Sequence, residues 1–116
     1  MVKQLTVVSL LLSLCGCMPD LCANKQIAEA VSPNDKLKAV TFRRDCGATT
    51  KETVQVSILP TKKSLPNEAG NVFVASGEPI VVVRWISDRH LSISGGGASG
   101  AFKADKSFGD IEVTYD

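Results

Sequence analysis

The residues able to carry acid–base or nucleophilic chemistry are few in this sequence. His90 is its single histidine, and Asp88 lies two residues before it. A serine hydrolase needs such a pair beside an activated serine, yet the sequence has no G-x-S-x-G nucleophile elbow. Because Asp88 and His90 fall in a predicted turn, where polar residues are common, we expect no catalytic triad and no enzyme activity.

A glycine-rich segment at 95–100, GGGASG, matches the G-x-G-x-x-G pattern of dinucleotide-binding loops. Such a loop needs a helix directly after it and an acidic residue about 20 positions further on. The segment that follows, AFKADKSFG, lacks helical periodicity. We therefore predict a flexible connection and no cofactor.

Four cysteines are the remaining reactive residues: Cys15, Cys17, Cys22 and Cys46. Structural zinc sites are usually built from repeated C-x-x-C pairs or from such a pair with two histidines. The sequence repeats no such pair and has one histidine, so we predict no metal site.

The N-terminus has the pattern of an export signal. Lys3 precedes a ten-residue apolar run at 5–14, which is shorter than the roughly 20 residues of a membrane span but typical of a signal peptide. The next residues, Leu14-Cys15-Gly16-Cys17, resemble the lipobox of bacterial lipoproteins. The resemblance implies cleavage after Gly16 and lipidation of Cys17, with plain secretion as the alternative.

The lipobox resemblance divides the chain into a signal peptide at 1–16, a lipidated tether at 17–20 and a single small domain at 21–116. Lipoproteins that stay in the inner membrane of Gram-negative cells usually have Asp at the second mature position, where this chain has Met18. The resemblance thus implies an anchor in the outer membrane, with the domain facing the periplasm.

The same resemblance assigns the cysteines. Cys15 leaves with the signal peptide and Cys17 carries lipid, which leaves Cys22 and Cys46 in an oxidising compartment. We expect these two to form a disulfide. In the chain-entropy model, closing a loop of roughly 25 residues stabilises a fold by about 3.5 kcal/mol.

A β-hairpin is predicted at 41–59, with Cys46 at its bend. Apolar residues occupy alternate positions of its two strands, namely Val40 and Phe42 in the first and Val54, Val56 and Ile58 in the second. This is the pattern of half-buried strands. Asp45 and Gly47 favour a turn between them, and Pro60 ends the second strand.

A short helix is predicted at 21–31, since Ala23, Ile27, Ala30 and Val31 share one helical face. Further strands are expected at 72–75, 80–86, 91–93 and 111–115, with the apolar run 80–86 as the central strand. The predicted fold is mainly β (α+β): an antiparallel meander sheet of about six short strands with one N-terminal helix packed on it. A small sandwich or barrel is the alternative.

Residues 32–94 resemble a family of short bacterial lipoproteins and secreted proteins that is defined as a domain of unknown function. The matching segments are SPNDKLKAVTFRRDCGATT, VQVSILP, LPNEAGNVFVA and VRWISDRHLSIS, of which RDCGATT and VRWISDRHL are the most specific. Family members often carry SPDGK where this chain has SPNDK, a difference that leaves the turn type open. The resemblance implies no activity, cofactor or catalytic residue.

The formal net charge is +1, with Lys and Arg scattered along the chain, so no nucleic-acid-binding face is expected. A possible recognition surface consists of Arg43, Arg44, Asp45, Thr49 and Thr50 in the hairpin, and Arg84 beside Trp85 in the apolar run. The alternatives are residues that shape the hairpin loop and an arginine that faces solvent.

The expected function is that of a bacterial envelope lipoprotein that is not catalytic and binds an envelope protein partner. The membrane is the second expected partner, through lipid on Cys17. The alternatives are an inhibitor or self-protection (immunity-type) lipoprotein and a small periplasmic hydrolase.

Overall fold

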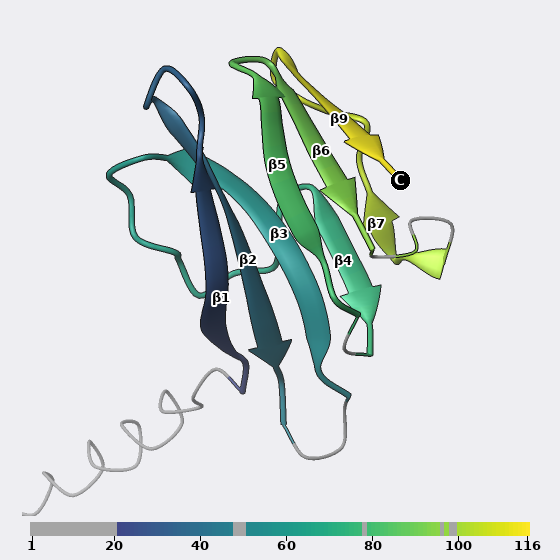
Figure 1. The fold of residues 1–116 in the computed structure, drawn as a ribbon. Coiled ribbons are helices and arrows are strands. Elements are labelled where there is room, and N and C mark those ends of the chain that lie inside the picture. The colour runs from purple at the N-terminus through teal and green to yellow at the C-terminus, as the bar shows by residue number, and fades with distance from the viewer. Residues whose placement is uncertain (1–20, 48–50, 78, 96, 98–99) are drawn as a thin grey trace, which may run out of the picture.

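In the computed structural model, which describes residues 21–47, 51–77, 79–95, 97 and 100–116, these residues form nine β-strands in two sheets (Figure 1). The strands are β1 (Ala23–Val31), β2 (Leu37–Asp45), β3 (Thr53–Pro60), β4 (Phe73–Ser76), β5 (Val82–Ser87), β6 (His90–Ser94), β7 (Lys103–Ala104), β8 (Ser107–Phe108) and β9 (Ile111–Tyr115). Sheet A has the strand order β1-β2-β3-β4-β7, and sheet B has the order β5-β6-β9-β8.

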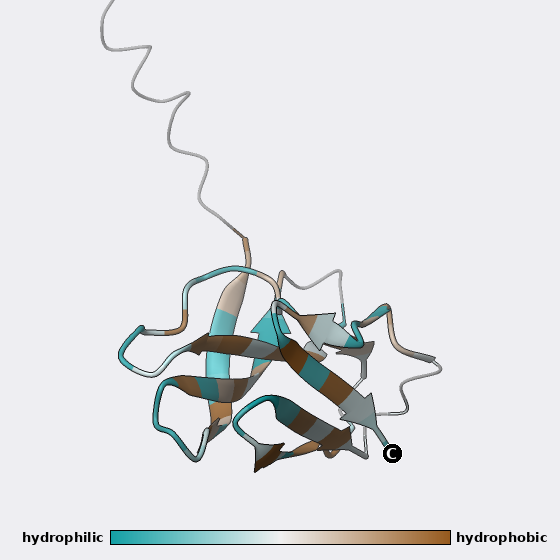
Figure 2. Ribbon diagram, turned by 90° about the horizontal axis from the view of Figure 1, so that it is seen from above, coloured by the Kyte–Doolittle hydropathy of each residue, from teal (hydrophilic) through white to brown (hydrophobic). Residues whose placement is uncertain are grey.

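One apolar core lies between the two sheets. Its fully buried members come from both of them: Ala39, Val56, Ile58, Val72, Phe73, Ala75, Leu91, Ile93, Ile111 and Val113. Figure 2 shows hydrophobic and hydrophilic residues alternating along the strands, as the period of two in a pleated strand requires. The inward faces predicted for the second hairpin strand, for 91–93 and for 111–115 are confirmed.

The prediction of a single antiparallel meander sheet covered by a helix was wrong. The chain leaves sheet A after β4 and starts sheet B with β5, and β9 pairs with β6 in parallel. Each sheet covers the apolar face of the other, so no helix is needed to bury it. The fold of the described residues is all-β, as in the sandwich considered as the alternative.

The predicted N-terminal helix is strand β1. It pairs with β2 along its whole length, from Ala23 opposite Asp45 to Val31 opposite Lys38. A β-bulge between Gln26 and Ala28 shifts the register, and β1 is an edge strand with most of its residues exposed. The bulge and the exposure remove the apolar alternation that marks a strand, and the remaining apolar residues happen to fall at helical spacing.

The apolar run 80–86 was predicted to be a central strand, and this prediction was wrong as well. Its residues 82–86 belong to β5, which lies at the edge of sheet B, and residues 80–81 precede this strand. Val83 and Trp85 pack on the core, whereas Val82 and Ile86 point outward with exposed fractions of 58% and 49%. In this protein, a strand with apolar residues on both faces therefore lies at the edge of a sheet and not in its middle.

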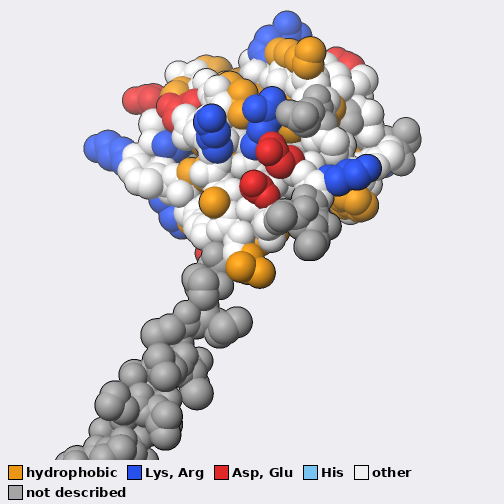
Figure 3. Space-filling view, turned by 90° about the horizontal axis from the view of Figure 1, so that it is seen from below, with side chains coloured by type: hydrophobic (Ala, Val, Ile, Leu, Met, Phe, Trp, Pro, Cys, Tyr) orange, Lys and Arg blue, Asp and Glu red, His pale blue; other side chains and the backbone are white. Residues whose placement is uncertain are grey.

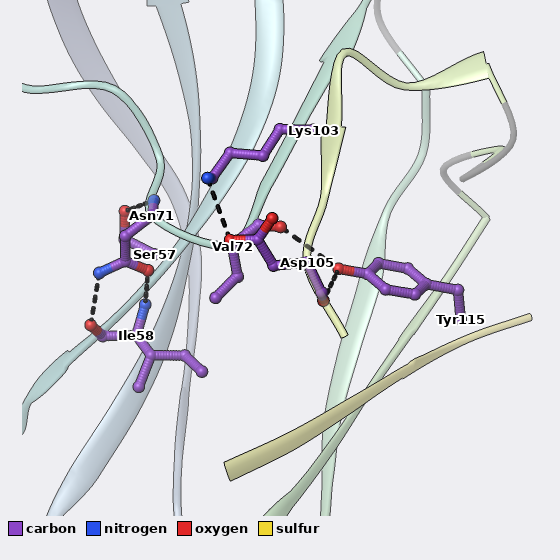
Figure 4. Close-up of polar contacts among 7 residues, drawn as sticks. All are labelled: Ser57, Ile58, Asn71, Val72, Lys103, Asp105 and Tyr115. Atoms are coloured by element: carbon purple, nitrogen blue, oxygen red, sulfur yellow. Dashed lines mark hydrogen bonds and ion pairs between the residues drawn. The ribbon is translucent and has the colours of Figure 1, made fainter. Parts of the chain in front are cut away.

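The outer face of sheet A is covered by the chain between β3 and β4. Val40, Phe42 and Leu59 form a second buried cluster on this face, and Leu65 of the connection packs against it. β4 pairs only with residues 53–56 of β3. Beyond this pairing, the side chain of Asn71 forms the hydrogen bonds with the backbone of β3 that a paired strand would otherwise form. The Ile58 N–H donates to Asn71 Oδ1 at 2.8 Å, and Asn71 Nδ2 donates to the Ile58 carbonyl at 2.9 Å (Figure 4).

Two aromatic side chains tie the sheets together at their edges. The Tyr115 hydroxyl of β9 donates to the carbonyl of Asp105 at 2.7 Å and lies 3.3 Å from that of Val72 (Figure 4). On the opposite side, Trp85 Nε1 of β5 donates to the Ala30 carbonyl of β1 at 2.8 Å. Each side chain satisfies a backbone carbonyl that strand pairing leaves open.

We expect Tyr115→Phe to lower the free energy of unfolding by about 1–2 kcal/mol, because it keeps the ring and removes a hydroxyl that donates to a partly buried carbonyl group. Urea denaturation of both proteins measures the difference. A change below about 0.5 kcal/mol would mean that water replaces the hydroxyl at no cost.

The stability difference between wild type and Tyr115→Phe is also expected to depend on pH. Desolvation by burial, with a smaller contribution from the Asp105 charge, raises the pKa of Tyr115 from 10.0 to about 12. A pKa raised on folding means that the neutral hydroxyl stabilises the fold below pH 10.0 and that this contribution is lost as the pH rises towards 12. The stability difference between wild type and Tyr115→Phe is therefore expected to shrink over this range.

Candidate functional site

Arg44, predicted as part of a recognition surface, has an internal role. Its guanidinium donates to Asn24 Oδ1 at 2.8 Å and to Asn67 Oδ1 at 2.9 Å. Asn24 in turn donates to the carbonyls of Pro66 and Glu68. These bonds fasten the connection between β3 and β4 to the beginning of β1, so Arg44 holds the cover of sheet A in place.

Arg43 lies next to Arg44 in β2 and therefore faces the opposite side of sheet A. Its Nε lies 4.0 Å from Glu52 Oε1, and it lines a hollow of about 280 Å³ with Ala23, Asn24, Lys25, Asp45 and Glu52. Asp45 Oδ1 accepts the Gly47 N–H at 3.0 Å, and Gly47 has φ +119°, as predicted for this turn. Thr49 and Thr50 lie outside the described residues.

Arg84 lies on the other sheet, on the outer face of β5, and faces solvent. It borders a shallow hollow of about 200 Å³ with Val82, Ser92, Ser94 and Asp116. The predicted recognition residues are thus not brought together: Arg43 and Arg44 point to opposite faces of sheet A, and Arg84 belongs to sheet B.

His90 is not part of a catalytic arrangement in the described residues. Its Nε2 lies 2.8 Å from the hydroxyl of Thr114 on the adjacent strand β9, where His90 itself is paired with Glu112. Asp88 stands in the turn before it and is exposed. The histidine thus has a hydroxyl partner on the outer face of sheet B, whereas a triad would need Asp88 and an activated serine on its two ring nitrogens.

The predicted disulfide is confirmed. Cys22 and Cys46 are joined by an S–S bond of 1.98 Å, and they extend the pairing of β1 with β2 by one step beyond Ala23 and Asp45. We call this end of the sandwich, where Leu21 leads into β1, the entry end. Cys17, the predicted lipidation site, lies outside the described residues.

The largest hollow that we describe lies at the opposite end, which we call the distal end. It has a volume of about 400 Å³ and is formed by the turns that join β1 to β2, β5 to β6 and β8 to β9. Its lining residues, together the distal hollow, are Asn34, Lys36, Leu37, Asp88, Arg89, Asp110 and Ile111. Figure 1 shows these connections at the top, where β1 and β5 end.

The wall contributed by the first turn is rigid. Ser32, only 3% exposed, accepts the Leu37 N–H at its hydroxyl, and that hydroxyl donates to Asn34 Oδ1 at 2.8 Å. Asp35 adopts φ +63°, and its carbonyl accepts the Thr61 hydroxyl at 2.7 Å. The Ser32 N–H also donates to the Leu37 carbonyl and the Asp35 N–H to the Ser32 carbonyl, both at 2.8 Å, so side-chain bonds reinforce a turn that the backbone already closes.

The distal hollow has an apolar floor and a charged rim. Leu37 and Ile111 are half-buried and buried, respectively, and form the apolar part. Arg89 Nε lies 3.7 Å from Asp110 Oδ2, with both side chains 77% exposed. An ion pair this exposed contributes little to stability, so these charges are available to a binding partner.

The distal hollow was not predicted from the sequence. Asn34 and Asp88 were interpreted as turn residues, because strong turn signals explain them without any function. The three turns are far apart in the chain and meet only because the two sheets stack, so no local pattern indicates the hollow.

Comparison of the chain with protein-family models, with curated proteins and with solved structures found no match. Among the described residues, no helix has the length and apolar character needed to cross a bilayer. The fold and the site define a disulfide-linked β-sandwich with a charged hollow at the end opposite its N-terminal entry.

Proposed function

We propose that this protein is an envelope lipoprotein, anchored through Cys17, whose sandwich is a non-catalytic module that binds a protein partner at the distal hollow. The observation that carries the proposal is the placement of that hollow at the end opposite the chain entry. Apolar floors with charged rims resemble the anatomy of protein interfaces.

The geometry fits an anchored receptor. From Cys17 to Cys22 the chain can span about 18 Å at most, so the entry end stays close to the membrane when Cys17 carries lipid. A nine-residue strand such as β1 is about 30 Å long. The distal hollow would therefore point away from the bilayer, where a periplasmic partner can reach it.

The resemblance to short bacterial lipoproteins also supports the distal hollow as the binding site. Its motifs SPNDK and VRWISDRHL supply Asn34, Lys36, Asp88 and Arg89 to one hollow. The inhibitor alternative is a special case of the same binding module. It would apply if the bound partner proved to be a toxin or a lytic enzyme.

The anchor is tested by incorporation of labelled palmitate in growing cells. We expect label in the wild type and none in Cys17→Ser, because lipid is attached through the thiol of this residue. Cys15→Ser is the matched control, since Cys15 would be removed with the signal peptide. Label retained by Cys17→Ser would contradict the lipobox assignment.

The binding site is tested by photo-cross-linking in intact cells. A photoreactive amino acid at Asn34 or Asp88 is expected to capture one dominant partner, and the same group at Glu68, on the cover of sheet A, is the control. Arg89→Glu is expected to weaken the interaction about 30-fold, because it reverses a charge on the rim and places like charges opposite each other in the complex. Its 77% exposed side chain makes a folding defect unexpected.

Equal capture from Asn34, Asp88 and Glu68 would show non-specific proximity and would reject the distal hollow. Capture from Asn34 that survives Arg89→Glu unchanged would place the contact elsewhere on the distal end. Identification of the captured protein then decides between a structural envelope partner and a toxin or lytic enzyme.

A further inference from the structure

Along one side of the sandwich the two sheets are not joined, and we call this side the open seam. Its borders are β1, an edge strand of sheet A, and β5, an edge strand of sheet B. Residues on or beside both strands line a hollow of about 220 Å³: Ala28, Glu29, Ala30, Ala39, Thr41, Val81, Val82 and Val83. An edge strand presents backbone N–H and C=O groups that can pair with a strand of another chain.

Exposed hydrophobic side chains follow both borders of the open seam. Ile27 and Val31 of β1 and Val82 and Ile86 of β5 are 42–58% exposed. Single exposed apolar residues are normal on a protein surface, but four on two neighbouring edge strands indicate a surface that a partner covers. The entry end differs, since Figure 3 shows described side chains of both signs there among scattered hydrophobic ones.

The two borders carry opposite charges. Glu29 is paired with Val40 of β2 and lies on the outer face of sheet A, where its carboxylate is 37% exposed and lies 3.6 Å from Lys38 Nζ. Arg84 is exposed on the outer face of β5 and has no ion pair or hydrogen bond within the described part of the chain. Opposite charges on neighbouring strands stabilise their pairing. The bulge in β1 turns Lys25 to the other face of its sheet, so a second β1 offers Glu29 no cation, whereas a second β5 does.

β1 and β5 run in the same direction, and both lead into turns of the distal hollow (Figure 1). Within one chain, the bond from Trp85 Nε1 to the Ala30 carbonyl places these two residues at about the same height along the sandwich. Glu29 and Arg84 each precede one of them by one residue. They therefore also lie at about the same height, on the outer faces of their sheets.

The direction of a two-fold axis follows from the proposed lipid anchor, on which this step rests. A symmetric pair of copies anchored in one membrane has its axis normal to that membrane, and β1 leads away from the entry end (Figure 1), so the axis is parallel to the strands. Such an axis leaves every residue at its own height and brings β1 of one copy beside β5 of the other, in parallel. Glu29 of each copy then lies opposite Arg84 of the other.

We propose that two copies of this chain associate through their open seams, with β1 of each copy paired in parallel with β5 of the other. Sheet A of each copy continues into sheet B of the other, and both distal hollows face away from the membrane. Hydrophobic residues flank the ion pair on both sides. The aligned pairs are Ile27 with Val82, Ala28 with Val83, Glu29 with Arg84, Ala30 with Trp85 and Val31 with Ile86.

The size of the open seam fits a weak dimer. A nine-residue strand such as β1 is about 30 Å long, and two sheets about 10 Å apart with side chains on both outer faces make an edge roughly 20 Å thick. The seam would bury about 600 Å² on each copy, a total of roughly 1,200 Å² that is the lower limit for a stable interface. Confinement to one membrane favours the dimer by raising the effective concentration of the copies.

Disulfide cross-linking in intact cells tests this pairing. Two full-length chains with different affinity tags are co-expressed, one with Glu29→Cys and the other with Arg84→Cys. Neighbouring strands place the two Cα atoms about 4.8 Å apart, within the range of a disulfide, so we expect a disulfide that joins the two tags. Wild-type chains give the background from the native cysteines. Glu29→Cys with Glu112→Cys is the matched control, because Glu112 is exposed on β9, inside sheet B.

A link between the Glu29→Cys and Arg84→Cys chains well above both controls supports the proposal. Absence of that link overturns it, and so does equal linking through Glu112→Cys, which would show random collision. A stronger link between two Glu29→Cys chains would mean that two β1 edges pair, and a link from Glu29→Cys to a different protein would assign the open seam to another partner. Either result overturns the proposal.

Charge reversal gives an independent measure on the full chain purified in detergent. Arg84→Glu is expected to raise the dissociation constant of the dimer at least about tenfold, because it places two carboxylates opposite each other. Glu112→Arg is the control and is expected to leave this constant unchanged. Equal dissociation constants for the two variants would overturn the proposal. Palmitate labelling is scored separately: label without the disulfide link keeps the anchor and rejects the dimer, and the link without label keeps the dimer and rejects the anchor.

Discussion

Removal of the Cys22–Cys46 disulfide is expected to lower the free energy of unfolding by about 3.5 kcal/mol, the value for closing a loop of this size in the chain-entropy model. The bridge joins residues 24 positions apart and holds the beginning of β1 against the end of β2. Most residues of β1 are exposed, so this edge strand contributes little apolar burial of its own. Urea denaturation of a Cys22→Ser, Cys46→Ser double variant measures the loss.

Hydrogen exchange locates the effect. Amides of β1 are expected to lose protection in the double variant before those of β3, which is buried along six of its eight residues. Cys15→Ser serves as the control and is expected to leave stability unchanged. A loss below about 1 kcal/mol would show that the reduced chain keeps β1 paired in its unfolded ensemble or that the bridge is strained.

Phe42→Ala is expected to lower the free energy of unfolding by about 3–5 kcal/mol, the range for truncating a buried phenylalanine. Phe42 is fully buried, but it lies on the outer face of sheet A, away from the core between the sheets. Its burial depends on the connection between β3 and β4, which Arg44 and Asn24 fasten to β1. Thermal or urea denaturation measures the change.

Val82→Ala is the matched control, because Val82 lies on the uncovered outer face of sheet B and is 58% exposed. We expect a change within about 0.5 kcal/mol for it. If Phe42→Ala were as mild as Val82→Ala, the connection over sheet A would be a loose loop and not a cover that completes a second core.

Local sequence patterns were sufficient for the central strands. Val54, Val56 and Ile58 alternate with polar residues, and so do Ile111 and Val113, because each of these strands places one face in the core. Local chemistry was also sufficient for the turn at Asp45 and Gly47. The disulfide was predicted from the two cysteines that the lipobox resemblance leaves unassigned, and it is confirmed.

The sequence by itself thus determined the strands that contact the core, one turn and the covalent bridge, because each depends on neighbouring residues or on a count of thiols. Only the tertiary structure decided that residues 23–31 form an edge strand, since an exposed strand with a bulge has no alternation to read and is held by pairing with β2. The tertiary structure also brought Asn34, Asp88 and Asp110 into one hollow. These residues are far apart in the chain and meet only because two sheets stack with their turns at a common end, which no local pattern encodes.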